Sequence, residues 1–120
     1  MKDIMYDENN IFAKIIRGEI PCDKVYEDDN TLFFKDINPI AKVHVLGIPK
    51  SQCVDFSDFI LKNTPTTISE FFKKTNLVIE KLGIINDGYK VISNSGINGG
   101  QEVPHFHIHI LGGQKISLSY

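Results

Sequence analysis

The chain has 120 residues, which suits a single domain that buries roughly two thirds of the surface exposed by its unfolded chain. Its composition, with 42% hydrophobic and 23% charged residues, is that of an ordinary globular protein. The formal net charge of −2 gives no electrostatic reason to expect nucleic acid or an anionic membrane as a partner, and no apolar run is long enough to span a bilayer. We therefore expect a protein that binds neither nucleic acid nor membranes.

The two cysteines indicate a reducing compartment. Cys22 and Cys53 lie far apart and form no CxxC pattern, so two free thiols are a better interpretation than a disulfide or a zinc site. The acidic segment 1–8 contains no hydrophobic stretch of the kind found in signal peptides. Both observations favour a cytoplasmic location.

The first part of the chain predicts a short helix followed by three strands. Polar residues 1–9 are expected to form a flexible N-terminus, after which Asn10 can cap a helix over residues 11–17 that ends at Gly18. Turn-forming residues 28–30 separate two strand-like segments and so predict a hairpin. The three expected strands cover residues 24–27, 31–36 and 43–48.

The remainder predicts a long helix and two further strands. Apolar residues recur with helical spacing across residues 64–82, and Thr64 with the proline after it is a typical helix start. Gly83 is placed to end this helix. Two more strand-like segments, 89–93 and 105–110, lie on either side of a glycine-rich loop.

The order of these elements predicts the fold class and the limits of the domain. Hairpin-like connections and one long helix are typical of an α+β domain. We expect a mainly antiparallel five-stranded sheet with one long helix and one short helix. The domain should cover residues 10–113 and be followed by a C-terminal tail at 114–120.

The most informative segment is a row of histidines in the last expected strand. Histidines and apolar residues alternate strictly there, so a strand would place the imidazoles on one face and the apolar side chains on the other. Histidine titrates near neutral pH, which suits a nucleophile, a proton carrier or a metal ligand. The imidazoles belong to His105, His107 and His109, three of the four histidines in the chain.

Three kinds of site fit this row. Two imidazoles at this spacing can bind zinc, but zinc needs a third protein ligand and nothing in the sequence marks His44 for that role. A structural or pH-sensing cluster explains the alternation but not the loop before it. Nucleophilic catalysis by one neutral imidazole, with neighbours that bind the charge of the substrate, accounts for both.

The loop over residues 95–101 favours the catalytic interpretation. Its three glycines allow backbone N–H groups to approach an anion closely, although Asn98-Gly99 is also a good hairpin turn. The segment is not a Walker A loop, because it lacks the GxxxxGK[ST] pattern. A glycine-rich loop next to three histidines predicts a phosphate pocket with a nucleophile beside it.

Residues 105–111, HFHIHIL, resemble the HxHxHxx motif of the histidine triad (HIT) superfamily of nucleotide hydrolases and transferases. The similarity extends over residues 10–113 and is closest to the Hint branch. The segments that carry it are 11–16, 20–21, 27–29, 34–39, 44–50, 99–101 and 111–113. The resemblance implies a HIT-like fold whose sheet extends across a homodimer.

The resemblance also implies roles for the histidines. His107 would be the nucleophile that attacks the α-phosphorus and becomes nucleotidylated, and His109 would contact the phosphate. His105 would help to fix the orientation and tautomer of His107. His44 matches a position next to the triad that tunes its protonation. The scheme needs no metal and no cofactor.

Matching positions imply a cleft for a purine nucleotide. Asp36 matches a carboxylate that holds the ribose hydroxyls, a task suited to two acceptor oxygens. The base would lie in an apolar cleft formed by Ile11, Phe12, Phe34 and Ile37. The phosphate would contact a loop formed by Asn94, Gly100, Gln101 and Glu102.

The implied reaction is hydrolysis of purine nucleoside 5′-phosphoramidates to nucleoside monophosphates, through a covalent intermediate on His107. An amine leaves phosphorus poorly unless it is protonated, so a site that supplies both a base and an acid suits a P–N bond. Two alternatives remain open. The same histidines could hydrolyse dinucleoside polyphosphates or transfer nucleotidyl groups, or the protein could be a nucleotide-binding or interaction module with little turnover.

One position departs from the family pattern. Hint proteins carry a serine that interacts with the leaving group where this chain has Glu102. The carboxylate places negative charge near the phosphate. We expect it to select cationic leaving amines.

Overall fold

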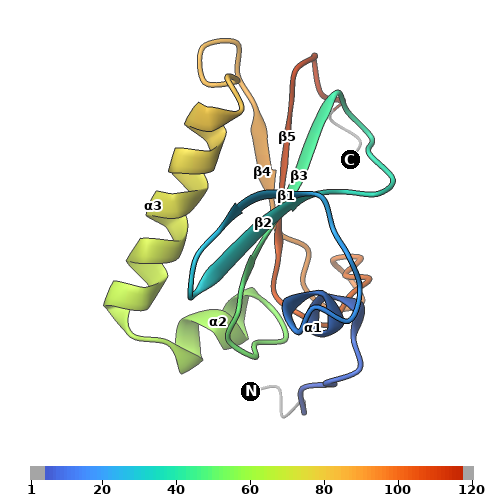
Figure 1. Ribbon diagram of the computed structural model, residues 1–120, viewed down its shortest axis with the longest axis vertical. Helices are drawn as coiled ribbons and strands as arrows, with labels where there is room; N and C mark the ends of the chain where they lie inside the picture. The colour runs from blue at the N-terminus through green and yellow to red at the C-terminus, as the bar shows by residue number, and fades with distance from the viewer. Residues whose placement is uncertain (1–4, 118–120) are drawn as a thin grey trace.

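The computed structural model describes residues 5–117 and has an α+β fold (Figure 1). The helices are α1 (Ile11–Ile16), α2 (Phe56–Lys62) and α3 (Pro65–Lys81). The strands are β1 (Lys24–Glu27), β2 (Thr31–Lys35), β3 (Val43–Pro49), β4 (Lys90–Ile92) and β5 (Ile108–Gly112). They form one sheet in the order β1-β2-β3-β5-β4, in which all neighbours are antiparallel. The predicted fold class and five-stranded sheet are confirmed.

Side chains cap the helices where the sequence indicated. The Asn10 side chain accepts a hydrogen bond from the backbone N–H of Ala13 at the start of α1. Thr64 accepts one from the N–H of Thr67, and a proline occupies the first turn of α3. Each cap satisfies an N–H group that has no partner inside its helix. The expected starts of both helices are therefore confirmed.

The helix α2 was not expected, so the domain has two short helices rather than one. The Asp55 side chain caps it by accepting a hydrogen bond from the N–H of Asp58, at 2.9 Å. Aspartate is a common N-cap residue, because its carboxylate can accept from a free N–H group in the first turn of the helix. With only Phe59 buried along its length, α2 has too little apolar periodicity to stand out in the sequence.

The last strand begins at Ile108, three residues later than expected. The backbone N–H of Phe106 donates to the carbonyl of Cys53 at 2.8 Å, outside the pairing between strands. Of the three histidines in the row, only His109 therefore lies on β5. The other two are held by contacts of their own, described below.

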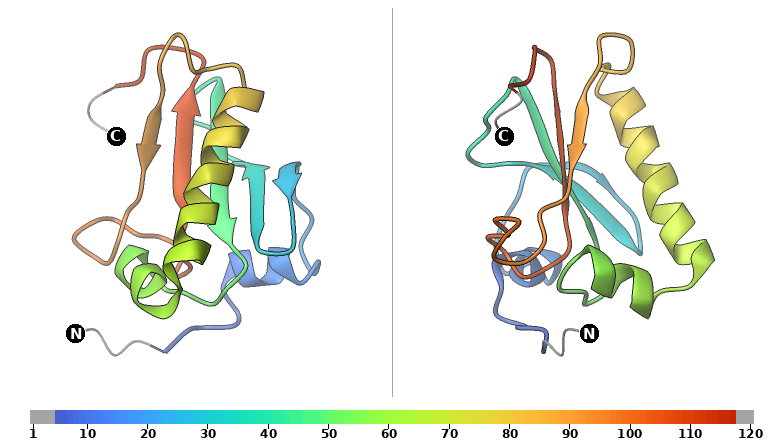
Figure 2. Two further views of the ribbon diagram at one scale, coloured as in Figure 1. Left: turned by 90° about the vertical axis from the view of Figure 1, so that its left-hand side faces the viewer. Right: turned by 180° about the vertical axis from the view of Figure 1, so that it is seen from behind.

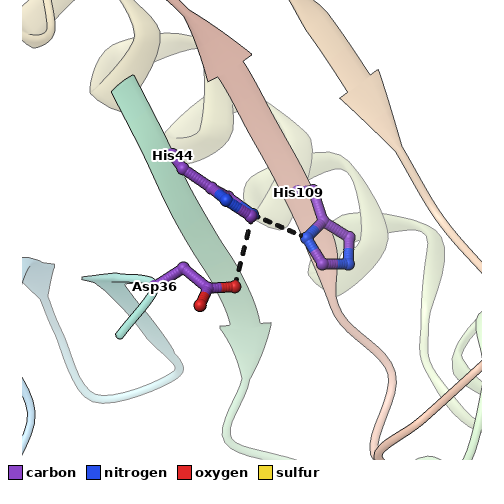
Figure 3. Close-up of side chains that lie close together, drawn as sticks. All are labelled: Asp36, His44 and His109. Atoms are coloured by element: carbon purple, nitrogen blue, oxygen red, sulfur yellow. Dashed lines mark hydrogen bonds and ion pairs between the residues drawn. The ribbon is translucent and has the colours of Figure 1, made fainter. Parts of the chain in front are cut away.

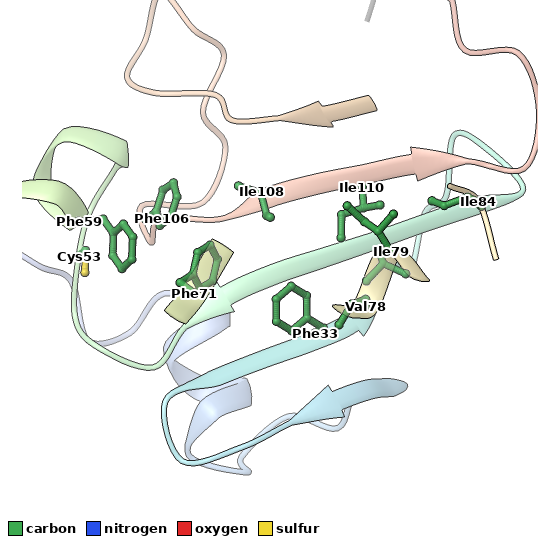
Figure 4. Packing of buried hydrophobic residues seen from close by; sticks show 11 residues of the cluster. Phe33, Cys53, Phe59, Phe71, Val78, Ile79, Ile84, Phe106, Ile108 and Ile110 are labelled. Carbon is green, nitrogen blue, oxygen red and sulfur yellow. The ribbon is translucent and has the colours of Figure 1, made fainter. Parts of the chain in front are cut away.

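The main hydrophobic core lies between the sheet and the helices α2 and α3 (Figures 1 and 4). Alternate residues of the strands point into it, including Phe33 from β2 and both Ile108 and Ile110 from β5. The ring of Phe33 lies over Gly47, where a Cβ would overlap two carbons of the ring. Glycine at this point of β3 is therefore needed for the ring to pack.

A second apolar cluster lies on the opposite face of the sheet, beneath α1. It consists of Phe12, Leu32, Phe34, Leu46 and Ile48. Figure 2 shows α1 near the loop that precedes β5, at one end of the sheet. The two faces are thus divided: one is covered by the long helix, and the other carries α1 and the polar groups of the candidate site.

The ends of the described chain make specific contacts. The N–H of Asn9 donates to the Asp7 carboxylate, and the Gln114 side chain accepts from the N–H of Lys42. The flexible terminus expected at residues 1–9 and the tail expected at 114–120 fall partly outside the described residues. Within residues 5–117, the structure has no helix with the length and apolarity needed to cross a membrane.

Candidate active site

Three polar side chains form a row across neighbouring strands (Figure 3). Asp36 follows β2, and its N–H donates to the carbonyl of His44 on β3 at 3.0 Å. On the other side of β3, Leu46 is paired with His109 and His44 is paired with Leu111. His44 and His109 are therefore diagonal neighbours on the same face of the sheet, close enough for their rings to meet.

Hydrogen bonds fix where the protons of this row lie. The backbone N–H of Ile40 donates to Nδ1 of His44 at 3.2 Å, so neutral His44 carries its proton on Nε2. That Nε2 lies 2.9 Å from Nδ1 of His109 and 3.3 Å from a carboxylate oxygen of Asp36. Because Nδ1 of His109 accepts the hydrogen bond from Nε2–H of His44, neutral His109 carries its own proton on Nε2. The row is a chain of hydrogen bonds with a defined direction.

His107 is oriented by the main chain. Its Nδ1 lies 2.7 Å from the carbonyl oxygen of His105, which can only accept, so Nδ1 carries the proton. Nε2 of neutral His107 then carries the lone pair that a nucleophile needs, on a residue that borders a cavity described below. The ring of Phe12 packs edge-on against the imidazole, with centroids 4.9 Å apart, and the His109 ring makes a second edge-on contact at 5.2 Å.

His105 is fully buried, and both of its ring nitrogens have hydrogen-bond partners. Its Nε2 donates to the carbonyl of Pro49 at 2.8 Å, and its Nδ1 lies 2.6 Å from the hydroxyl of Tyr6. The side chain of His105 therefore anchors the segment, while its backbone carbonyl orients His107. The expected influence of His105 on the tautomer of its neighbour has a structural basis in the carbonyl rather than the ring.

All four imidazoles are held neutral near pH 7. Burial lowers the pKa of His105 to about 4. Burial, together with the charges that His107 and His44 would carry, lowers the pKa of His109 to about 4 as well. Burial also lowers the pKa of His107 and of His44, in the second case against the opposing effect of Asp36. A neutral His107 can act as a nucleophile without first losing a proton.

A cavity of about 1080 Å³ opens beside this row. It is bordered by the imidazoles of His44, His107 and His109 and by most of the residues singled out in the sequence, namely Ile11, Phe12, Phe34, Asp36, Ile37, Asn94, Gly100 and Glu102. Phe12 and Phe34 belong to the second apolar cluster and form a buried wall, whereas Ile37 is 91% exposed at the rim. The cavity combines an apolar wall with a small number of polar groups, as small-molecule sites commonly do.

His105 and Gln101, two of the predicted site residues, do not border the cavity. The Gln101 amide accepts from the N–H of Gly96 and donates to the carbonyls of Val54 and Val103, at distances from 2.6 to 3.0 Å. These bonds tie the glycine-rich loop to the segment before α2. In this structure Gln101 supports the shape of the loop.

The glycine-rich loop is braced by its own hydrogen bonds. The backbone N–H of Gly100 donates to Ile97 and that of Gln101 to Gly96, while the Asn94 side chain donates to the carbonyl of Gly99. Several amides that the sequence suggested for anion binding are thus engaged inside the loop. What the loop brings to the cavity is Asn94, Gly100 and the exposed Glu102.

The charged residues that border the cavity are mostly acidic. They are the carboxylates Asp23, Asp36 and Glu102 and a single lysine, Lys35, which lies 3.7 Å from Asp23. A cavity with this balance attracts cations, and it repels a singly charged anion less than a polyphosphate. The neutral imidazoles add hydrogen-bond donors without adding charge.

Asp36, His44 and His109 also lie close enough to act as metal ligands, with one possible ligand atom from each within 4.8 Å of the others. To bind a cation through Nε2, His44 would have to carry its proton on Nδ1, where the N–H of Ile40 already points. The observed hydrogen bonds therefore suit a row in which His44 and His109 each carry a proton on Nε2 better than they suit a metal site.

Comparison with known proteins agrees with this arrangement. The HIT domain model matches residues 17–116. The chain belongs to the HIT family. A purine nucleoside phosphoramidase from Escherichia coli K12 is 40% identical over 109 residues, which cover 91% of each chain. A HIT-like protein from Azospirillum brasilense is 46% identical over 111 residues, covering 92% of this chain and 91% of the relative.

Solved structures agree as well. A histidine triad protein from Clostridium difficile is 40% identical and superposes with a TM-score of 0.82, covering 94% of this chain and 97% of that one. A HIT family hydrolase from Clostridium thermocellum is 39% identical with a TM-score of 0.80, covering 92% and 96%. At the level of the HIT family, these relatives support a nucleotide-processing hydrolase.

Two contacts of this HIT domain were missed in the sequence. The N–H of Ile40 sets the tautomer of His44, and Tyr6 contacts His105. The contact from Ile40 could not have been found in the sequence, because every residue except proline has a backbone N–H. Tyr6 lies in a segment expected to be flexible, and its aromatic side chain among polar neighbours was the only signal available.

Proposed function

We propose that this HIT protein hydrolyses purine nucleoside 5′-phosphoramidates through a covalent nucleotidyl intermediate on His107. The observation that carries the proposal is the 2.7 Å contact between Nδ1 of His107 and the carbonyl of His105. It leaves the Nε2 lone pair of a neutral imidazole available for attack on phosphorus.

The proposed reaction has two steps. Nε2 of His107 forms a bond to the α-phosphorus while the P–N bond breaks, and the leaving nitrogen takes a proton from a solvent water molecule, which becomes hydroxide. The Nε2–H of neutral His109 donates a hydrogen bond to a phosphoryl oxygen and keeps its proton. A second water molecule then attacks the phosphorus, the P–Nε2 bond breaks, and the proton lost by this water neutralises the hydroxide. The products are an amine and a nucleoside monophosphate, and no metal takes part.

The charge of the cavity favours a phosphoramidate over a dinucleoside polyphosphate. A nucleoside 5′-phosphoramidate has one ester bond and one P–N bond and carries a single negative charge at phosphorus, whereas a polyphosphate brings several. With three carboxylates and one lysine among the bordering residues, the cavity offers little to neutralise a polyphosphate chain. The 40% identity to a purine nucleoside phosphoramidase points the same way.

Other residues that border the cavity are suited to contact the purine, the ribose and the phosphate of such a substrate. Phe12 and Phe34 supply the apolar wall for a purine, with Ile11 and Ile37 nearer the rim. The Asp36 carboxylate would accept hydrogen bonds from the ribose hydroxyls. Asn94, Gly100 and Glu102 also border the cavity and would contact the phosphate and the leaving amine.

The proposal includes a homodimer and a cytoplasmic location. The outer side of β4 has no strand partner among residues 5–117, because β4 is the last strand of the sheet. Apolar side chains that are more than two-fifths exposed lie at or near this edge and on α3, namely Leu77, Ile85, Tyr89 and Val91. Cys22 and Cys53 are free thiols, as in a reducing compartment.

The test is hydrolysis of adenosine 5′-phosphoramidate by the wild-type protein and by His107→Asn, with EDTA present throughout. The proposal expects turnover in the wild type and a loss of at least about 10³-fold in the variant. Binding of adenosine monophosphate should survive the substitution, because the ribose and base contacts are retained. If the wild type binds the nucleotide but does not turn over the phosphoramidate or a dinucleoside polyphosphate, the binding-module alternative is correct.

A further inference from the structure

The hydroxyl of Tyr6 contacts the first histidine of the triad. It lies 2.6 Å from Nδ1 of His105, and the two rings meet edge to face with centroids 5.6 Å apart. Tyr6 precedes α1 and lies outside residues 17–116, which the HIT domain model matches. It does not border the cavity beside His107 and His109, so it would not touch a nucleotide there.

The direction of this hydrogen bond follows from the other nitrogen of the ring. Nε2 of His105 donates to the carbonyl of Pro49, so Nδ1 of the neutral ring has a lone pair and Tyr6 must donate. Burial raises the pKa of the Tyr6 hydroxyl, which therefore keeps its proton at neutral pH. Both nitrogens of a fully buried imidazole are thereby satisfied.

A turn holds Tyr6 in place. The side chain and the backbone N–H of Asn10 both donate to the carbonyl of Asp7, at 2.7 and 3.2 Å, while Asn10 also caps α1. The guanidinium of Arg17 donates to the carbonyl of Glu8. The segment that presents the hydroxyl is therefore bonded to the start and the end of the same helix.

The ring of His105 is connected to the nucleophile through the backbone of His105 itself. The carbonyl that accepts the Nδ1–H of His107 belongs to His105. A ring held at both nitrogens restricts the rotation of its own residue and so the direction of that carbonyl. Without the hydroxyl of Tyr6, Nδ1 of His105 would be a buried acceptor with no donor, and the ring would gain by moving.

We propose that Tyr6 is a positioning residue for the nucleophile: by anchoring the ring of His105, it holds the carbonyl that keeps Nε2 of His107 directed at phosphorus. The catalytic consequence rests on the function proposed above, whereas the effect on the two imidazoles does not. Tyr6 acts through another residue and touches no reacting atom.

The kinetic test compares Tyr6→Phe with Tyr26→Phe. Tyr26 is a matched control, because its hydroxyl also makes one hydrogen bond, to the Asp28 carboxylate at 3.0 Å, but on β1 and away from the cavity. For adenosine 5′-phosphoramidate we expect Tyr6→Phe to lower kcat about threefold to tenfold without changing KM. Tyr26→Phe should change neither. An unchanged kcat, or an equal fall in both variants, would overturn the proposal.

A spectroscopic test separates this proposal from the proposed function. Long-range ¹H–¹⁵N NMR of the resting protein reports the tautomer and hydrogen bonding of each imidazole. In the wild type we expect Nδ1 of His105 to be an unprotonated, hydrogen-bonded nitrogen and His107 to be the Nδ1–H tautomer. Tyr6→Phe should move the ¹⁵N shift of His105 Nδ1 towards that of a free acceptor and mix the tautomers of His107.

If both imidazoles keep their wild-type signals in Tyr6→Phe, Tyr6 does not position them and the proposal is wrong. If the wild type proves inactive on phosphoramidates, the proposed function fails, yet the NMR result still decides the role of Tyr6. The two failures are thus distinguishable.

Discussion

Nδ1 of His107 donates to the carbonyl of His105 at 2.7 Å, so the main chain, rather than another side chain, sets the tautomer of the proposed nucleophile. A backbone carbonyl can only accept, which makes the assignment independent of pH as long as His107 is neutral. The same segment is anchored behind the site by the bond from His105 to Pro49. The segment that leads into β5 therefore fixes the orientation of Nε2 of His107.

The fall of activity on acidification should occur at a pH below the ordinary pKa of histidine. Attack requires neutral His107, and burial lowers its pKa below the ordinary value of 6.5. We expect the acid limb of kcat/KM, which reports the free enzyme, to be centred below pH 6.5. The measurement is kcat/KM for adenosine 5′-phosphoramidate in buffers of constant ionic strength. An acid limb centred above pH 6.5 would mean that His107 is not held neutral by burial.

Stability should also fall as the pH is lowered from neutrality. The pKa of His105 is lowered to about 4, so the unfolded chain binds more protons than the folded protein between the ordinary value of 6.5 and pH 4. The free energy of unfolding is then fully present above pH 6.5 and decreases as the pH falls through this window. From His105 alone we expect a decrease of about 2 kcal/mol between pH 7 and pH 5.

Urea unfolding at pH 7 and pH 5 measures this difference. His109→Gln removes a second histidine whose pKa is lowered, so the decrease should be smaller in that variant than in the wild type. Equal stability of the wild type at the two pH values would contradict the assignment of buried, neutral imidazoles.

Glu102 should influence the choice of leaving group. Its exposed carboxylate borders the cavity, so it attracts a cationic amine and repels an anionic one. We expect Glu102→Ser to lower the ratio of kcat/KM for a cationic leaving amine over a neutral one by about threefold, an effect that added salt should weaken. Glu80→Gln, on the exposed side of α3 and away from the cavity, should leave the ratio unchanged. An unaltered ratio in Glu102→Ser would show that Glu102 does not select the leaving group.

Gly99→Ala should impair the loop more than the fold. A Cβ at this position would overlap the backbone carbonyl of Ser95 and lie 2.8 Å from its nitrogen, so the loop must change shape. We expect kcat/KM to fall by about tenfold or more, because Asn94 and Gly100 would shift at the cavity, with little change in Tm. Ile97→Ala is the control, since that side chain is 98% exposed in the same loop. Equal activity of the two variants would show that the shape of the loop is unimportant.

Much of the fold could be predicted because each signal was local. The cap at Asn10, the start of α3 at Thr64 and the alternation that directs Ile108 and Ile110 into the core all follow from short-range patterns. The helix α2 was missed because it has a cap but almost no apolar stripe. The late start of β5 was missed because the partner of Phe106 is the carbonyl of Cys53, far away in the sequence.

Most residues of the candidate site could be predicted from the sequence, whereas their hydrogen bonds and proton positions could not. Side chains with recognisable chemistry, such as His44, His109 and Asp36, were identified and do lie together. Their proton positions depend on the N–H of Ile40, which any residue except proline would supply. Gln101 shows the converse: its place in a motif suggested contact with phosphate, whereas in this structure its amide braces the loop.

The most direct test of the central claim is to look for the intermediate. The wild-type protein is mixed with adenosine 5′-phosphoramidate, quenched within milliseconds, and digested for mass spectrometry under conditions that preserve phosphorus–nitrogen bonds. We expect an adenylyl group on the peptide that contains residues 105–109, attached to His107, and none in His107→Asn. Turnover without any adduct, or an adduct on His105 or His109, would contradict the assignment of His107 as the nucleophile.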